Sequence, residues 1–109
     1  MSQTITSPDV EQLKQDQLEP LFDVILLDDD DHTYEYVIEM LQKLFCHSAT
    51  QGFRHAVEVD TMGRTVVITC ELPQAKFARD QIHNYGADWR MPWSKGSMSA
   101  IIEQAKPKS

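Results

Sequence analysis

Residues 24–45 of the chain read VILLDDDDHTYEYVIEMLQKLF. The run Val24–Leu27 is continuously apolar and begins with β-branched Val24 and Ile25, as in a central strand, and four aspartates follow it directly. Thr33 can then act as the N-cap of a helix with Glu35 in its first turn. The pattern predicts a strand over 22–27, an acidic loop, and a helix from Tyr34. Its buried face, at i, i+3, i+4, i+7 spacing, is predicted to carry Val37, Met40, Leu41, Leu44 and Phe45.

A second helix is predicted after Ser48, because Ser48 and Gln51 form a capping-box signature, and it extends to Asp60. The turn at 62–64 leads into a β-branched strand over 65–70. The apolar face of this second helix is predicted to carry Phe53, Ala56, Val57 and Val59.

Pro73 fits the first residue of a third helix, which Gly86 is predicted to close. An aromatic-rich loop over 88–96 follows, and alternation from Met98 predicts a last strand. The order βααβαβ predicts an open α+β sandwich with the helices on one side of a three-stranded sheet. The third helix is predicted to bury Ala75, Ala78, Ile82 and Tyr85.

The length and charge of the chain limit its function. Its 109 residues suffice for one domain, predicted over 22–105, between a flexible extension over 1–21 and a short tail over 106–109. A net charge of −7 disfavours nucleic acid and anionic membranes and favours a cationic partner. The absence of a signal peptide or membrane span predicts a cytoplasmic protein, in which Cys46 and Cys70 are reduced structural thiols.

The acidic run invites a metal or a catalytic interpretation, and both are rejected. Asp28, Asp30 and Glu39 match positions 1, 3 and 12 of an EF-hand loop, but His32 and Thr33 occupy positions 5 and 6, where the loop needs a ligand and a glycine. The histidine and cysteine spacings do not suit zinc. No nucleophile is paired with a base, so we expect no enzyme, no metal and no cofactor.

Residues 24–45 closely resemble the opening of the ClpS family, adaptors that hand N-degron substrates to the Clp protease. The family pattern is an apolar strand, Asn-Asp-Asp, a few variable residues, and a helix start rich in acidic, aromatic and valine residues that ends in Leu-Gln-Lys. The likeness covers about residues 22–105. It implies a three-stranded antiparallel sheet with three helices packed on one face.

The resemblance also implies a site for the ammonium group of a protein N-terminus. Asp29 matches the family's amine-binding aspartate, while Asp28 stands where the family usually has asparagine and Asp60 where it usually has histidine. These three side chains are expected to bind the amine. The matching pocket for the first side chain is expected to involve Asp30, His32, Tyr34, Val37, Met40, Ala56, Val59 and Met98.

A small Ala56 and a rigid Tyr34 favour flat aromatic first residues over β-branched ones. The alternative for each apolar pocket residue is an ordinary place in the core. Docking to the N-terminal domain of a Clp ATPase is expected near Glu71, Lys76 and Arg79, although the family's acidic and lysine positions hold Pro73 and Ala78 here. The alternative for those three charged residues is a plain solvated surface.

The expected function is a monomeric adaptor that binds substrate proteins beginning with Phe, Tyr, Trp or Leu. Two alternatives stay open. The extra acids Asp28 and Asp60 could favour a basic first residue, such as Arg or Lys. The chain could instead be a plain interaction domain, like the similarly folded C-terminal domain of the ribosomal stalk protein, without N-terminus recognition.

Overall fold

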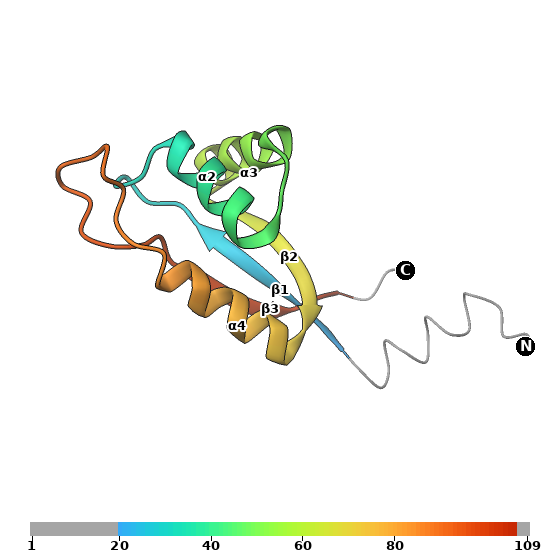
Figure 1. Ribbon diagram of the computed structural model, residues 1–109. Helices are drawn as coiled ribbons and strands as arrows, with labels where there is room; N and C mark the ends of the chain where they lie inside the picture. The colour runs from blue at the N-terminus through green and yellow to red at the C-terminus, as the bar shows by residue number, and fades with distance from the viewer. Residues whose placement is uncertain (1–19, 107–109) are drawn as a thin grey trace, which may run out of the picture.

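A computed structural model describes residues 20–106, so the predicted extension over 1–21 and the tail over 106–109 lie almost wholly outside the described residues. The sheet has the order β2-β1-β3, with β1 paired antiparallel to both neighbours. The predicted α+β class and the order βααβαβ are confirmed (Figure 1). The elements are β1 (Leu21–Leu27), α2 (Tyr34–Phe45), α3 (Ala49–Met62), β2 (Arg64–Glu71), α4 (Leu72–His83) and β3 (Ala100–Gln104).

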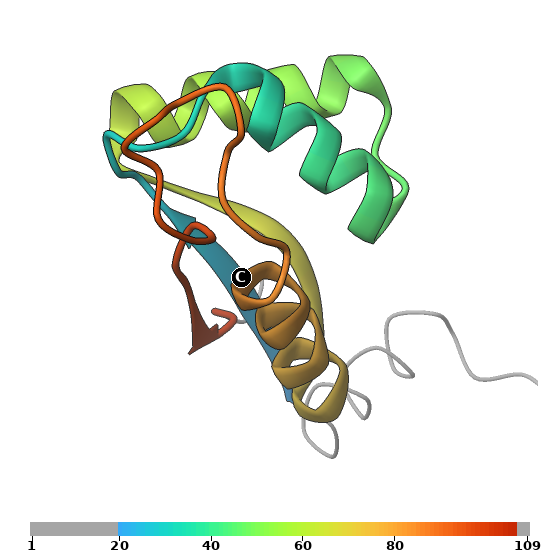
Figure 2. The same cartoon turned by 60° about the vertical axis from the view of Figure 1, so that its left-hand side comes forward.

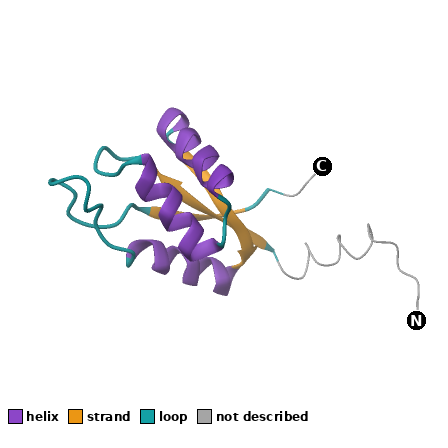
Figure 3. Ribbon diagram, turned by 45° about the horizontal axis from the view of Figure 1, so that its top comes forward, coloured by secondary structure: helices purple, strands orange, loops and turns teal. Residues whose placement is uncertain are grey.

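One apolar core joins the sheet to all three helices. Val24 and Leu26 of the central strand, with Val67 of β2 and Ala100 of β3, face the helices. Alternate residues of a strand share one face, so this set defines the covered side of the sheet. Figure 2 shows the helices gathered on that side, and Figure 3 separates the helical layer from the strands. The helices add Tyr36, Val37, Met40, Leu41, Ala56, Val59, Ala75, Ala78 and Ile82 to this core.

The opposite face of the sheet carries Ile25, which is nonetheless only 1% exposed. Ile25 pairs with Val66 on one side and Ile101 on the other. An ion pair of 2.8 Å joins Arg64 of β2 to Glu103 of β3 across the central strand. These neighbours shield Ile25 although no described helix packs on this face.

The helix starts follow from their caps. The Thr33 side chain accepts a hydrogen bond from the Tyr36 amide, and Ser48 and Gln51 form the predicted capping box. Gly63 ends α3 with a φ of 85°, a conformation that suits glycine. The acidic loop and the reversal at Gly63 are thereby brought to the same end of the sheet.

Helices α2 and α3 approach closely at Gly52. A Cβ atom at this position would lie 3.2 Å from the Ile38 Cα atom, closer than side chains normally pack. Gly52 is therefore the point where the backbones of the two helices meet.

Several details differ from the prediction. Phe53 is 51% exposed, because α3 buries the row Gly52, Ala56 and Val59, and Phe53 lies beside that row. Helix α3 also runs two residues further, to Met62, and Pro73 is the second residue of α4. Helix α4 ends at His83, so Tyr85 packs edge-on against Tyr36 from outside the helix, and β3 begins at Ala100 instead of Met98.

Candidate functional site

The acidic loop, residues 28–33, connects the end of β1 to the start of α2. Its position is fixed by backbone bonds from two directions. The Leu27 amide donates to the Ser99 carbonyl at 2.9 Å, and the Asp28 amide donates to the Gly63 carbonyl at 3.0 Å. The loop therefore begins where the ends of β1, α3 and the segment before β3 converge.

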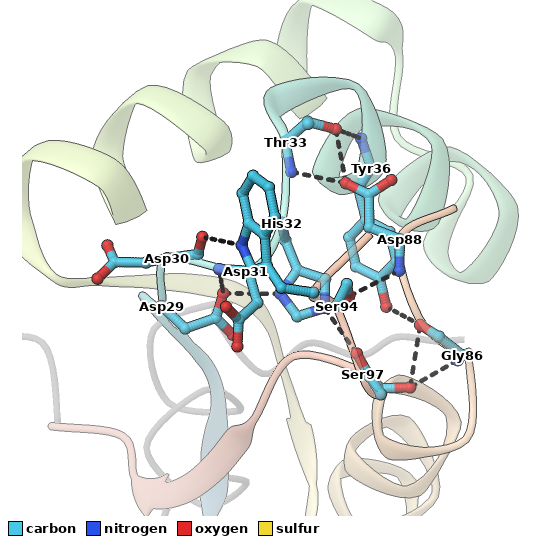
Figure 4. Close-up of polar contacts among 12 residues, drawn as sticks. Asp29, Asp30, Asp31, His32, Thr33, Tyr36, Gly86, Asp88, Ser94 and Ser97 are labelled. Atoms are coloured by element: carbon cyan, nitrogen blue, oxygen red, sulfur yellow. Dashed lines mark hydrogen bonds and ion pairs between the residues drawn. The ribbon is translucent and has the colours of Figure 1, made fainter. Parts of the chain in front are cut away.

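Asp29 and His32 form a hydrogen-bonded pair within the loop. Asp29 Oδ1 lies 2.7 Å from His32 Nδ1 and accepts a bond from the Asp31 amide at 3.0 Å. The other ring nitrogen of His32 lies 2.7 Å from the Gly96 carbonyl oxygen. Figure 4 shows His32 between Asp29 and the 94–97 segment, with the Asp30 side chain pointing away from this network. The Asp29 carboxylate is thus oriented while its side chain stays 31% exposed.

A second group joins Asp28 to the end of α3. The Tyr34 hydroxyl donates to Asp60 Oδ2 at 2.5 Å. Partial removal from water raises the pKa of Asp28, and the charges of Asp60, Asp29 and Asp30 raise it further. The hydrogen bond to Asp60 is the main cause that raises the pKa of Tyr34. The predicted amine-binding residues Asp28 and Asp60 are therefore close enough to repel each other.

The predicted apolar pocket residues lie together in the core. Each is at most 3% exposed, and Tyr34 packs against them from the side of the acidic loop. Their burial fits both a pocket floor and an ordinary core, so their role stays a prediction. These residues are Val37 and Met40 of α2, Ala56 and Val59 of α3, and Met98 before β3.

Asp88, which is 1% exposed, was not predicted from the sequence as part of the site. Its Oδ2 accepts bonds from the amide and the hydroxyl of Thr33 at 2.7 and 2.8 Å, and its Oδ1 accepts from Arg90. Burial raises the pKa of Asp88, but these hydrogen bonds outweigh burial and hold the pKa below its ordinary value. Asp88 thereby ties the aromatic-rich loop to the start of α2. An aspartate in a predicted loop carries no signal for such a contact.

Two open hollows lie away from the acidic loop. The first, of about 380 Å3, is on the outer face of α3 and includes Phe53, Val57 and Met62. The second, of about 340 Å3, lies at the start of α4 and is lined by Pro20, Phe22, Glu71, Leu72 and Pro73.

The second hollow contains one of the three residues expected at the Clp-docking surface, Glu71. Lys76 is exposed on α4, and the Arg79 Nε atom lies 3.2 Å from Asp80 Oδ1. Ala78, at the family's lysine position, is only 4% exposed, so it belongs to the core.

The cysteines and the helices give three further facts. Cys46 and Cys70 are both free thiols, as predicted; Cys46 is exposed at the C-cap of α2, and Cys70 is partly exposed. No group of three or more His, Cys, Asp or Glu side chains within residues 20–106 is arranged to hold a metal ion. In the same part of the chain, no helix has the length and apolar character needed to cross a membrane.

Comparisons with known proteins agree with this architecture. The family model described as "ATP-dependent Clp protease adaptor protein ClpS" matches residues 17–92. The ATP-dependent Clp protease adapter protein ClpS of Escherichia fergusonii is 31% identical over 100 residues, which are 84% of this chain and 92% of that relative. The structure of Agrobacterium tumefaciens ClpS2 bound to L-phenylalaninamide superposes with a TM-score of 0.68 at 25% identity, over 80% of this chain and 99% of that one.

These matches confirm the resemblance, and with it the non-enzymatic adaptor function expected of the family. They extend over both sides of the acidic loop, from before β1 to beyond α4. The chain belongs to the ClpS family of adaptor proteins of the ATP-dependent Clp protease.

Proposed function

We propose that this ClpS-family chain binds the free N-terminus of proteins whose first residue is bulky and apolar, with aromatic residues preferred, and delivers them to a Clp ATPase. The observation that carries the proposal is the Asp29 carboxylate, which His32 and the Asp31 amide orient in the loop that directly follows the core strand β1. The structural relative from Agrobacterium was solved with L-phenylalaninamide, which presents a free ammonium beside a benzyl group. This is the chemistry of a protein that begins with phenylalanine.

Three carboxylates are assigned to the ammonium. An ammonium group has three N–H donors, and carboxylates are acceptors only, so Asp28, Asp29 and Asp60 suit it chemically. Asp29 is held by His32 before any ligand arrives, which lowers the cost of ordering the site. Asp28 and Asp60 repel each other in the free protein, and a bound cation relieves that repulsion.

The first side chain is assigned to the space bordered by Tyr34 and the core residues below it. Ala56 is the smallest of these residues, and its short side chain is the feature that favours a ring at this position. The Tyr34 hydroxyl is bound to Asp60, so its ring stands rigidly between the acidic loop and the core. A rigid entrance and a small residue below it favour flat side chains over branched ones.

The amine requirement is tested with fluorescence anisotropy. A labelled peptide that begins with Phe should bind, and its N-acetylated twin should not, because acetylation removes the charge. Equal affinity for both peptides, or no binding of either, overturns the proposal.

Asp29→Ala should weaken binding of the Phe peptide by about ten-fold or more, because a charge-assisted hydrogen bond is worth about 1.5–3 kcal/mol. Asp31→Ala is the matched control, since it removes the same charge from the same acidic run. Comparable losses in both variants would mean that the site responds only to overall charge.

A second candidate is preference for a basic first residue. The observation that favours it is the proximity of Asp28 and Asp60, where repulsion raises the pKa of Asp28. A peptide panel that differs only in residue one, with Phe, Trp, Leu, Val, Arg and Lys, separates the candidates. Tightest binding of Arg or Lys selects this second function, whereas a panel without discrimination selects a plain interaction domain.

Clp docking is assigned to the start of α4. The hollow beside Glu71 offers an apolar surface from Phe22 and Leu72, and the exposed Lys76 adds a charge one turn away. Arg79 follows Lys76 at i+3, on the same side of the helix. Co-sedimentation of Lys76→Glu with a Clp ATPase N-terminal domain should show reduced binding, and unchanged binding would rule out this surface as the docking site.

We also assign the chain to the cytoplasm, where we propose that it acts as a monomer.

A further inference from the structure

The aromatic-rich loop after α4 contains both tryptophans of the chain, Trp89 and Trp93. In Figures 1 and 2 this loop passes beside the acidic loop. Contacts given above tie the two together, through Asp88 with Thr33 and through His32 with Gly96. The aromatic-rich loop is therefore a fixed neighbour of the proposed amine site.

Trp93 connects directly to the acidic loop. Its indole N–H donates to the Asp30 carbonyl oxygen at 3.3 Å, yet 56% of the residue is exposed. A large aromatic side chain that is held in place and left open to solvent is a typical contact residue for a ligand. Trp89 differs, because it is 81% exposed and stacks on the Arg90 guanidinium, 4.6 Å from the ring.

We propose that Trp93 forms a second subsite, which packs against an apolar or aromatic side chain at residue two of the bound substrate. The inference rests on the proposed function, because the substrate must first be anchored by its amine. Trp93 would make the adaptor selective for two successive residues instead of one.

The position of Trp93 argues for this occupant. Asp30, whose carbonyl Trp93 binds, directly follows Asp29, the carboxylate proposed to hold the amine. Consecutive Cα atoms lie 3.8 Å apart, so residue two of the substrate cannot be far from the rim of the amine site. The rim is acidic, so an acidic second side chain is repelled, whereas an aromatic one can pack on the indole ring.

Binding is measured with three ligands that share a first residue. L-phenylalaninamide reports the first site alone, and two otherwise identical peptides that begin Phe-Phe and Phe-Gly report the second. The intact protein should bind Phe-Phe about two- to ten-fold more tightly than Phe-Gly, as expected for one aromatic pair. Trp93→Ala should abolish this preference and leave the affinity for L-phenylalaninamide unchanged. Trp89→Ala is the matched control and should preserve the preference.

Intrinsic fluorescence gives an independent readout. Trp89→Phe leaves Trp93 as the sole tryptophan, and its emission should shift to shorter wavelength with the Phe-Phe peptide and much less with Phe-Gly. The converse variant, Trp93→Phe, should show no shift from Trp89.

Two failures are distinguishable. If L-phenylalaninamide does not bind the intact protein, the proposed function fails. If it binds, and Trp93→Ala keeps the Phe-Phe preference or no preference exists at all, the second subsite is overturned. Self-association of the intact protein that Trp93→Ala abolishes, seen by sedimentation, would reassign the indole to a contact between copies of the chain and also overturn it.

Discussion

His32 faces an acceptor with each ring nitrogen, the Asp29 carboxylate at Nδ1 and the Gly96 carbonyl at Nε2, both at 2.7 Å. The His32 ring therefore bridges the acidic loop and the aromatic-rich loop, and this bridge fixes the position of the Asp29 carboxylate.

Peptide affinity is expected to fall on both sides of a pH plateau. On the acid side the loss should begin above the pH typical of an ordinary aspartate, because partial burial and Asp60 raise the pKa of Asp28, and a protonated carboxyl no longer attracts an ammonium. On the alkaline side the loss should follow the peptide amine, near pH 7.7–8.0. Asp60→Asn removes a charge that raises the pKa of Asp28, so its acid limb should move to lower pH in anisotropy titrations. An acid limb that stays in place would contradict the assigned coupling.

At the scale of elements, the start of α2 depends on a residue 55 positions away, because Thr33 caps the helix and is itself held by Asp88. Asp88→Ala should lower the free energy of unfolding by about 1–3 kcal/mol, since it leaves buried donors without an acceptor. Urea denaturation measures this, with the exposed Asp80→Ala as control. Similar losses in both variants would show that burial of Asp88 has no special weight.

Asp88 also predicts an acid limit of stability. Its pKa is lowered in the folded protein, so its contribution is fully present above the unfolded value of about 3.9 and is lost as pH falls through the lower folded value. Stability measured below about pH 4 should therefore fall less steeply in Asp88→Asn than in the intact protein.

A second element-scale effect comes from His55 on α3. Burial is the main cause that lowers the pKa of His55, and the nearby His47, whose ring centroid is 5.0 Å away, lowers it further. The unfolded chain therefore binds a proton at higher pH than the folded one. Stability should be fully present above about pH 6.5 and decline as pH falls through the lower folded value. His55→Gln should remove part of this slope in thermal melts, and an unchanged slope would contradict the assignment.

At the scale of the whole molecule, the net charge of −7 attracts cationic ligands over a distance. The association rate of a peptide with basic residues after its first Phe should fall as salt rises from about 0.05 to 0.5 M, because the screening length shortens. A peptide with neutral residues at those positions should lose much less. Stopped-flow measurements at both salt concentrations compare the two peptides, and equal salt dependence would rule out steering by the general field.

Most helices and strands of the fold could be predicted from local sequence patterns. Thr33, the Ser48–Gln51 box and the apolar helix rows are short-range signals, and each predicted its element. Long-range contacts left no such signal, which is why Asp88 and the bond from Trp93 to Asp30 escaped prediction. Phe53 was wrongly predicted to be buried because it lies at the edge of the apolar face of α3, and periodicity does not define that edge to within one residue.

The candidate site was predictable only in part. Asp28, Asp29 and Asp60 came from resemblance, and the fold brings Asp28 and Asp60 together from segments about 30 residues apart. His32, the partner of Asp29, follows it at i+3 and was expected in the pocket, but its hydrogen bond to Asp29 was not predicted. No sequence pattern distinguishes a pocket wall from ordinary core, so residues such as Val37 and Met40 remain assigned by likeness alone.

The contact at Gly52 has a consequence for ligand size. Helices α2 and α3 carry five of the residues proposed to enclose the first side chain, and their backbones touch at this glycine. Because Gly52 has no side chain, it sets how closely α2 and α3 approach each other. An added side-chain carbon at Gly52 would push the two helices apart by a few tenths of an ångström. The width of the proposed pocket therefore depends on a residue that no ligand needs to touch.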